Sequence, residues 1–301
     1  MDAEDLKRYV VDHRAPLREA MLGHKLWQTL SPAHDVVATV RCGVEEAAAH
    51  GLFDPARLIG GVDAMRFETV ERAVRETAPQ VVVNAIGLIK QIDAARDPVA
   101  CITLNALLPH QLATLCANLG ARLIHISTDC VFSGRSGMYD ESMPPDPVDL
   151  YGRSKFMGEP SGPGVLTLRT SLIGRELRGG YSLVEWFLAA QGPVRGFTQA
   201  FFSGFTTQEF SRLILRIIDQ RPGLEGLLHA SAGRISKHDL LVLLRGAFGL
   251  ATQIERDESL RLDRSLDSAR LRGLLGYTPP AWPEMVRELA AEKISNTPRR
   301  D

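Results

Sequence analysis

Two short stretches, STDCVF at Ser127–Phe132 and YGRSK at Tyr151–Lys155, carry the most information about this chain. The first follows the apolar run ARLIHI at 121–126, which is typical of a strand buried on both faces. Thr128 would then lie at the carboxyl end of a strand, the edge at which open α/β sheets bind ligands. Tyr151 and Lys155 are four residues apart, so a helix places them on one face. This order of elements predicts a site that transfers a proton alongside a hydride.

The side chains of these stretches suit that chemistry. A free tyrosine has a pKa of about 10 and is a poor proton donor or acceptor at neutral pH. An ammonium group one helical turn away is expected to lower the pKa of Tyr151, and it can also bind a ribose hydroxyl of a dinucleotide. The Thr128 hydroxyl can hold a substrate carbonyl oxygen. A tyrosine and a lysine at this spacing are common by chance, but here they follow the strand, the STD triplet and the loop in order.

Outward from these stretches, short apolar runs alternate with helical patterns. Such alternation predicts right-handed crossovers and a parallel sheet. We therefore expect an α/β protein with a Rossmann-like doubly wound parallel sheet and a smaller C-terminal substrate lobe, with a ligand cleft between them. The expected strands are at 35–40, 80–86, 121–127, 165–169 and 226–230, and the expected helices at 21–30, 44–50, 67–77, 100–119, 182–190, 207–219, 237–248 and from 282 onward.

The domain organisation follows from the same pattern. We predict an atypical N-terminal segment at 1–20, a dinucleotide-binding domain at 21–168 and a substrate-binding lobe at 169–301 that is interleaved with the first domain.

Composition excludes several classes of function. The 301 residues are 45% hydrophobic with a net charge of −1, so no basic stripe for nucleic acid or anionic lipid is expected. No apolar run approaches the length that spans a bilayer, and the first thirty residues do not resemble a signal peptide, so we expect a cytoplasmic protein. Neither a metal site nor a disulfide framework is expected, because the cysteines lie far apart at Cys42, Cys101, Cys116 and Cys130.

Taken together, the motifs resemble those of the extended short-chain dehydrogenases/reductases, specifically the dTDP-4-dehydrorhamnose reductase-like family that acts on nucleotide-linked sugars. The resemblance spans roughly residues 21–286. It rests on STDCVFSG at 127–134, YDE at 139–141, YGRSK at 151–155, GE at 158–159 and LRTS at 168–171.

The resemblance implies a catalytic triad of Thr128, Tyr151 and Lys155, with Tyr151 as the proton donor. It also implies that Asn105 supports the active site, although an asparagine bonded locally within its helix is an equal alternative. Cys130 stands at a position where related dehydratases have an acidic residue, and the absence of that acid disfavours dehydration. Related reductases often have tyrosine at the same position. We expect it to be a buried structural thiol.

Substrate contacts are expected from Asp129, from Arg169 at the entry to the lobe, and from Arg195, whose guanidinium could pair with a phosphate. Aromatic residues of the lobe could stack a base, but a core position is favoured for Trp186, Phe187, Phe201 and Phe202. A solvated face is expected for Arg261, Arg264, Arg270 and Arg272.

The glycine fingerprint of a dinucleotide fold is incomplete. Gly23 would be the third glycine of GxxGxxG, but Ala20 and Leu17 occupy the other two positions. Val11–Pro16, with three ionisable residues and a proline, makes a poor buried strand. The first twenty residues could be foreign to the domain, the cofactor could bind weakly, or catalysis could be lost. The abrupt start of the match at Met21 favours the first explanation, and we expect weak or no nicotinamide binding.

Other cofactor contacts are expected after the strands. Arg41 suits a 2′-phosphate, which favours NADP with NAD as the alternative, although an ordinary surface arginine is nearly as plausible. Asn84 and Ala85 are expected to line the cofactor side, together with Gly23 and Lys155. Lys90 and Gln91 lie on the following loop, where a solvated position is favoured.

The expected function is NADPH-dependent reduction of a keto group on a nucleotide-activated deoxysugar for surface polysaccharide synthesis. A sugar-nucleotide epimerase with a retained cofactor, or a non-catalytic regulatory or binding homologue, are the alternatives. The expected partner is the nucleotide-sugar substrate, and the resemblance also implies a homodimer.

Overall fold

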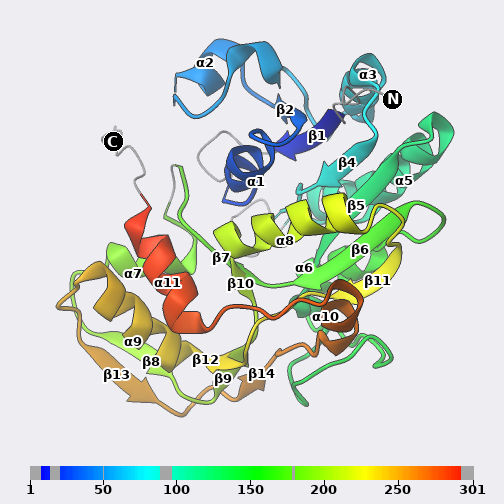
Figure 1. The fold of residues 1–301 in the computed structure, drawn as a ribbon. Helices are drawn as coiled ribbons and strands as arrows, with labels where there is room; N and C mark the ends of the chain where they lie inside the picture. Colours follow the sequence, from blue (N-terminus) through cyan, green and yellow to red (C-terminus); the bar gives the residue numbers. More distant parts are fainter. Residues whose placement is uncertain (1–7, 14–20, 50, 89–96, 178–179, 293–301) are drawn as a thin grey trace.

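The computed structural model describes residues 8–13, 21–49, 51–88, 97–177 and 180–292, the first range by its backbone alone. Its central element is a seven-stranded parallel sheet (Figure 1). This strand order is that of a doubly wound Rossmann sheet with one strand added, so the predicted fold class is confirmed. In spatial order the strands are β11 (Gly226–His229), β6 (Val165–Thr170), β5 (Arg122–Thr128), β4 (Val81–Asn84), β1 (Arg8–His13), β2 (Asp35–Val40) and β3 (Leu58–Ile59).

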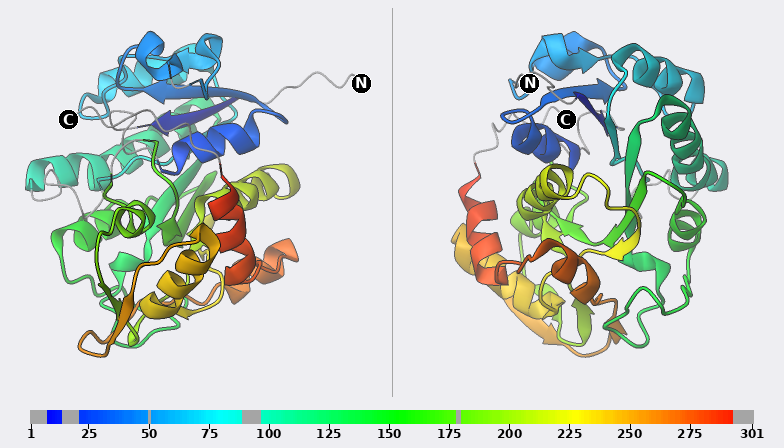
Figure 2. Two further views of the ribbon diagram at one scale, coloured as in Figure 1. Left: turned by 90° about the vertical axis from the view of Figure 1, so that its left-hand side faces the viewer. Right: turned by 45° about the vertical axis from the view of Figure 1, so that its right-hand side comes forward.

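Helices cover both faces of this sheet (Figure 2). α1 and α8 contact each other on one face, whereas α3, α5 and α6 lie on the other. A π-helical turn at Ile102–Leu107 joins α4 to α5. The helices of this part are α1 (Gly23–Leu30), α2 (Val44–Ala48), α3 (Phe67–Thr77), α4 (Pro98–Cys101), α5 (Leu108–Leu119), α6 (Leu150–Met157) and α8 (Thr207–Gln220), with 3₁₀ turns at Pro55–Arg57 and Asp129–Val131.

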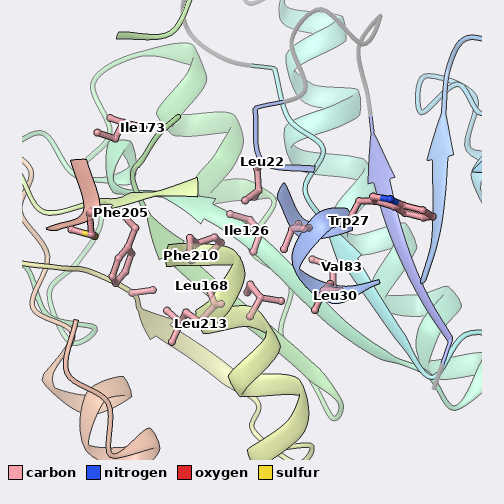
Figure 3. Close-up of a cluster of buried hydrophobic side chains, with 14 of the residues drawn as sticks. Leu22, Trp27, Leu30, Val83, Ile126, Leu168, Ile173, Phe205, Phe210 and Leu213 are labelled. Carbon is pink, nitrogen blue, oxygen red and sulfur yellow. The ribbon is translucent and has the colours of Figure 1, made fainter. Parts of the chain in front are cut away.

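Successive side chains of the central strands alternate between two hydrophobic cores, as the pleat of a strand requires. Val83 belongs to the core under α1 and α8, while its neighbour Val82 belongs to the core under α3 and α5. Figure 3 shows the first core, where Val83, Ile126 and Leu168 from three strands meet Leu30 of α1 and Phe210 of α8. Burial on both faces explains why these strands are continuous apolar runs in the sequence.

The N-terminal strand corrects one expectation. β1 lies between β2 and β4, and all six of its residues pair with β2. Residues 11–13 of the stretch that was expected to make a poor buried strand therefore do form a strand, because a ladder is formed by backbone groups. Leu17 and Ala20, at the missing glycine positions, lie outside the described residues.

The C-terminal lobe lies below the large sheet in Figures 1 and 2. It contains three small sheets, β10-β7, β12-β9-β14 and β13-β8. Because β11 and α8 return to the large sheet, the chain crosses between the two parts more than once; the domain boundaries given above remain a prediction. The elements of the lobe are β7 (Leu172–Ile173), α7 (Leu183–Leu188), β8 (Val194–Phe197), β9 (Ala200–Phe202), β10 (Phe205–Thr206), β12 (Ile235–Ser236), α9 (Lys237–Phe248), β13 (Ile254–Asp257), β14 (Leu262–Asp263), α10 (Ala269–Leu275) and α11 (Trp282–Ala291).

One helical stretch corrects the expectation that no apolar run approaches the length that spans a bilayer. Pro98–Leu119 is long and apolar enough to cross a membrane by length and composition, with a mean hydropathy of 1.4 over its most apolar window. Half of that window is buried inside the molecule. Leu104, Leu108 and Leu112 belong to the core on the α3 and α5 face of the sheet. In this structure the stretch is a core helix.

Candidate active site

A cavity of about 390 Å³ lies at the carboxyl edge of β4, β5 and β6, where the sheet meets the C-terminal lobe. Its wall is formed by the start of α1, the residues after β4 and β5, one face of α6 and several segments of the lobe. Six of the predicted site residues line it together: Gly23, Ala85, Thr128, Asp129, Tyr151 and Lys155. The sheet edge that the sequence indicated is thus the edge that carries the cavity.

Thr128 and Tyr151 both line this cavity. Thr128 is the last residue of β5, and its hydroxyl donates a 3.3 Å bond to Asp129 Oδ1 and accepts a bond of 3.1 Å from the backbone N–H of Cys130. Burial raises the pKa of Tyr151 above its ordinary value, and the bond to Thr128 opposes this shift. The phenol is therefore protonated at neutral pH, which is the form that a proton donor needs.

Lys155 is held one helical turn beyond Tyr151. Its Nζ donates a 2.7 Å hydrogen bond to the carbonyl of Ile126, and the residue is only 4% exposed. Burial lowers the pKa of Lys155 to about 8, against the opposing charge of Glu159. The expected lowering of the Tyr151 pKa by Lys155 is not seen in this structure: burial of the phenol raises that pKa, and Lys155 is not among the groups that shift it.

Glycine explains how α6 comes so close to the end of β5. A Cβ on Gly152 would lie 2.2 Å from the carbonyl oxygen of Cys130, and a Cβ on Gly158 would lie 1.8 Å from that of Asn105. The side chain of Asp149 caps the helix by accepting a 2.8 Å bond from the N–H of Gly152. The glycine of YGRSK is thus required by the approach of α6 to the residues that follow Thr128.

Asn105 ties two walls of the cavity together. Its Oδ1 accepts a 2.9 Å bond from the N–H of Leu88, and its Nδ2 donates to Ser154 Oγ at 3.2 Å. Ser154 directly precedes Lys155 on α6, and Leu88 belongs to the segment after β4. Asn105 was expected either to support the active site or to bond within its own helix. These contacts agree with support of the site, since neither partner lies on the helix that contains Asn105. Its π-helical turn is a type of distortion that often occurs at functional sites.

Two predicted ligands are engaged elsewhere. Asn84 is fully buried, where its amide bonds His125 at 3.1 Å and the N–H of Ile86 at 3.0 Å, so it does not line the cavity as predicted. Arg169 is also buried and forms a bidentate ion pair with Glu159 at 2.7 and 2.8 Å. The Arg169 guanidinium faces Glu159 and does not line the cavity, so the structure does not bring it to the predicted substrate site.

Other predicted ligands lie away from the cavity. Arg195 is an exposed residue of β8 and pairs with Asp257, so the structure does not bring it to the predicted substrate site. Arg41 is exposed just after β2 and does not line the cavity; its role towards a 2′-phosphate remains a prediction. Lys90 and Gln91 lie outside the described residues.

The cavity also contains charged residues that sequence reasoning missed. Arg264 was expected on a solvated face, but it lines the cavity, with Nε 3.0 Å from the carbonyl oxygen of Phe132 and Nη1 3.6 Å from Cys130 Sγ. Lys237 and Glu176 line it as well. Cys130 was expected to be buried, but it is partly exposed on the cavity wall, where burial raises its pKa to about 12. No local motif marks Lys237 or Arg264, because both come from the lobe, more than a hundred residues after Thr128.

Comparison with known proteins agrees with this geometry. The family model described as the RmlD substrate binding domain matches residues 18–255. A probable low-salt glycan biosynthesis reductase of Haloferax volcanii is 28% identical over 251 residues, which cover 76% of this chain and 83% of that protein. A dTDP-4-dehydrorhamnose reductase of Mycolicibacterium smegmatis is 34% identical over 184 residues, covering 57% of this chain and 55% of that protein.

A solved structure shows the same fold. The dTDP-4-dehydrorhamnose reductase of Bacillus anthracis, in complex with NADP, superimposes with a TM-score of 0.76 at 20% identity. The match covers 94% of this chain and 98% of that one. These comparisons confirm the family that the sequence motifs indicated.

Proposed function

The chain belongs to the family of the RmlD substrate binding domain, and from that membership we propose that it reduces a keto group on a nucleotide-activated deoxysugar with NADPH, in surface polysaccharide synthesis. The observation that carries this proposal is that Thr128, Tyr151 and Lys155 line one cavity together at the carboxyl edge of the sheet. The named relatives are reductases, one of glycan biosynthesis and one of dTDP-4-dehydrorhamnose.

The residues of the cavity fit a dinucleotide on the nicotinamide side. A Cβ on Gly87 would lie 3.3 Å from Asn105 Oδ1 and 3.7 Å from Lys155 Nζ. Because glycine has no side chain, the cavity stays open beside Lys155. Gly23 lies at the start of α1, where backbone N–H groups favour an anion. Gly23, Gly87 and Lys155 would hold the cofactor, which when bound supplies the hydride.

The protein's own groups then complete the reaction. Thr128 would orient the carbonyl oxygen towards Tyr151, whose protonated phenol would donate the proton to the developing alkoxide. Lys155, charged below about pH 8, would hold the cofactor ribose beside them. The apolar walls of the cavity would exclude water from both transfers.

The test follows NADPH absorbance and sugar product with candidate keto sugar nucleotides at saturating NADPH. Tyr151→Phe removes the proton donor, so we expect turnover to fall by about 10²–10⁴-fold with little change in sugar-nucleotide binding. Tyr181→Phe is the matched control, because Tyr181 is half exposed and does not line the cavity. Unchanged turnover in Tyr151→Phe would refute the proposal.

The same assay separates the two alternatives from the sequence. An epimerase with a retained cofactor would convert the sugar without added NADPH, and a non-catalytic homologue would show no turnover at saturating cofactor. The homodimer remains a prediction of the family resemblance, to be tested by the mass of the protein in solution.

A further inference from the structure

A buried ionic cluster joins residues from three of the sequence motifs. Glu159 of the GE motif forms the bidentate ion pair with Arg169 of the LRTS motif, and the two side chains are 8% and 2% exposed. His229 of β11 extends the cluster, with its Nε2 3.4 Å from Arg169 Nη1. Its Nδ1 donates a 2.9 Å bond to the carbonyl of Tyr139 in the YDE motif. These motifs therefore meet at one place in the fold, next to the elements that carry the proton-transfer residues.

The carboxylate of this cluster serves two buried cations. Glu159 follows Lys155 by four residues, about one helical turn, and its charge raises the pKa of Lys155 against the effect of burial. The same carboxylate neutralises Arg169, whose Nη1 approaches an imidazole that burial disfavours as a cation, because the pKa of His229 is lowered. An ammonium that is 4% exposed is costly unless an opposite charge compensates it. Glu159 provides that charge.

The other titratable groups around α6 do not replace Glu159 in this role. They are Cys101 of α4, His110 of α5, His125 of β5, and Asp129 and Cys130 of the 3₁₀ turn after β5. Burial keeps His125 neutral and raises the pKa of Asp129. It also raises the pKa values of the two thiols. The charge that stabilises the Lys155 ammonium is that of Glu159.

Glu159 also restrains the end of β5. Its Oε1 accepts a 2.6 Å bond from the hydroxyl of Ser127, which directly precedes Thr128. Lys155 binds the same strand, where its Nζ donates to the carbonyl of Ile126. One carboxylate thus connects the strand end that carries Thr128 with the ammonium of Lys155.

We propose that Glu159 is a positioning residue of the catalytic cavity, whose carboxylate keeps Lys155 in the ammonium form and holds the end of β5 through Ser127. This inference rests on the proposed function, in which the Lys155 ammonium holds the cofactor ribose. Glu159 does not line the cavity, so it acts on the reaction through these two neighbours.

The test follows the titration of Lys155 by NMR of protein that is isotope-labelled at the lysine Cε, and Lys155→Met assigns the signal. Glu159→Gln removes the charge, and Glu159→Asp keeps it on a shorter side chain. The double variant Glu159→Gln with Arg169→Gln also removes the guanidinium that would be left without its partner. Glu185→Gln is the matched control, because Glu185 forms an ion pair with Arg175 at 2.6 Å and does not line the cavity.

In the wild type we expect the midpoint at about pH 8. Glu159→Gln should lower it by about one pH unit or more, because the opposite charge is lost and the guanidinium of Arg169 is no longer neutralised. Glu159→Asp and Glu185→Gln should leave it within about half a unit. The double variant should also lower the midpoint, and it provides the test if Glu159→Gln does not fold. The break in kcat/KM for NADPH should move in the same direction.

Two results would overturn the inference. One is an equal midpoint in wild type and in the variants that lack the Glu159 carboxylate. The other is a midpoint lowered as much by Glu185→Gln, because the loss of any ion pair would then suffice. The titration needs no turnover, so an absence of product in the reductase assay would refute the proposed function without changing the measured midpoints.

Discussion

At the scale of single residues, Lys155 predicts how activity depends on pH. Its pKa is lowered to about 8, so the ammonium is present below that pH and is lost as the pH rises through it. Tyr151 does not titrate in this window, because burial raises its pKa above the ordinary value of about 10. We expect kcat/KM to fall about tenfold per pH unit above pH 8.

The measurement is a kcat/KM profile for NADPH from pH 6 to 10 at constant ionic strength. Since kcat/KM reports the free protein, the break should coincide with the loss of the Lys155 ammonium. A profile that stays level from pH 8 to 10 would contradict the assignment of Lys155 as the ribose ligand.

Arg169 and Thr170 show what residue-level sequence reasoning could not resolve. Both end the strand that enters the lobe, and adjacent strand residues point to opposite faces. Thr170 lines the cavity, while Arg169 points to Glu159, which also accepts a 2.6 Å bond from Ser127. A guanidinium near a sheet edge is equally consistent in sequence with a substrate ligand or a buried ion pair. Only the position of Glu159, just after α6, decides between them.

At the scale of elements, the glycine of YGRSK should be irreplaceable. In Gly152→Ala the new Cβ would meet the carbonyl of Cys130 at 2.2 Å, so α6 must shift away from β5. We expect a loss of about 1–3 kcal/mol in the free energy of unfolding, with lower turnover because Tyr151 moves with the helix.

Gly246→Ala in α9 is the matched control, since nothing lies within 4 Å of its added Cβ. Alanine is the better helix former, so this variant should gain up to about 1 kcal/mol. Urea unfolding of both variants provides the comparison. A Gly152→Ala protein as stable and as active as wild type would contradict the close approach of α6.

The elements that the sequence predicted well share one property. β2 and α3 have the predicted bounds, and the central strands were found because burial on both faces leaves continuous apolar runs. The strands that were missed, such as β7, β10 and β14, are two residues long. They are defined by partners distant in the sequence, as where Phe205 pairs with Leu172, so no local periodicity reveals them.

At the scale of the whole molecule, the cavity is where sequence reasoning reached its limit. Thr128, Tyr151 and Lys155 come from one stretch of chain, and their motif could be recognised. Lys237 and Arg264 reach the same cavity only because the lobe folds back over the edge of the sheet. Their local sequences resemble any charged helix start or loop. The proton-transfer residues were therefore predictable, whereas the charges facing them required the tertiary structure.

The last prediction concerns how the whole fold binds its cofactor. β1 occupies the centre of the sheet and Gly23 lines the cavity, so the elements on either side of residues 14–20 are in place. In the sequence between them, Leu17 and Ala20 stand at positions where the fingerprint has glycine, which lets a backbone approach the pyrophosphate. We expect a dissociation constant for NADPH weaker than micromolar, measured by fluorescence titration.

The double substitution Leu17→Gly and Ala20→Gly tests the cause of that weakness. Removing both side chains opens the approach to the helix N-terminus, so the glycine variant should bind NADPH at least about tenfold more tightly, or by about 1.4 kcal/mol. Gly246→Ala serves again as the control, because α9 lies in the lobe and its added Cβ touches nothing. Micromolar binding by the unaltered chain would show that a leucine and an alanine at these positions still leave room for the pyrophosphate.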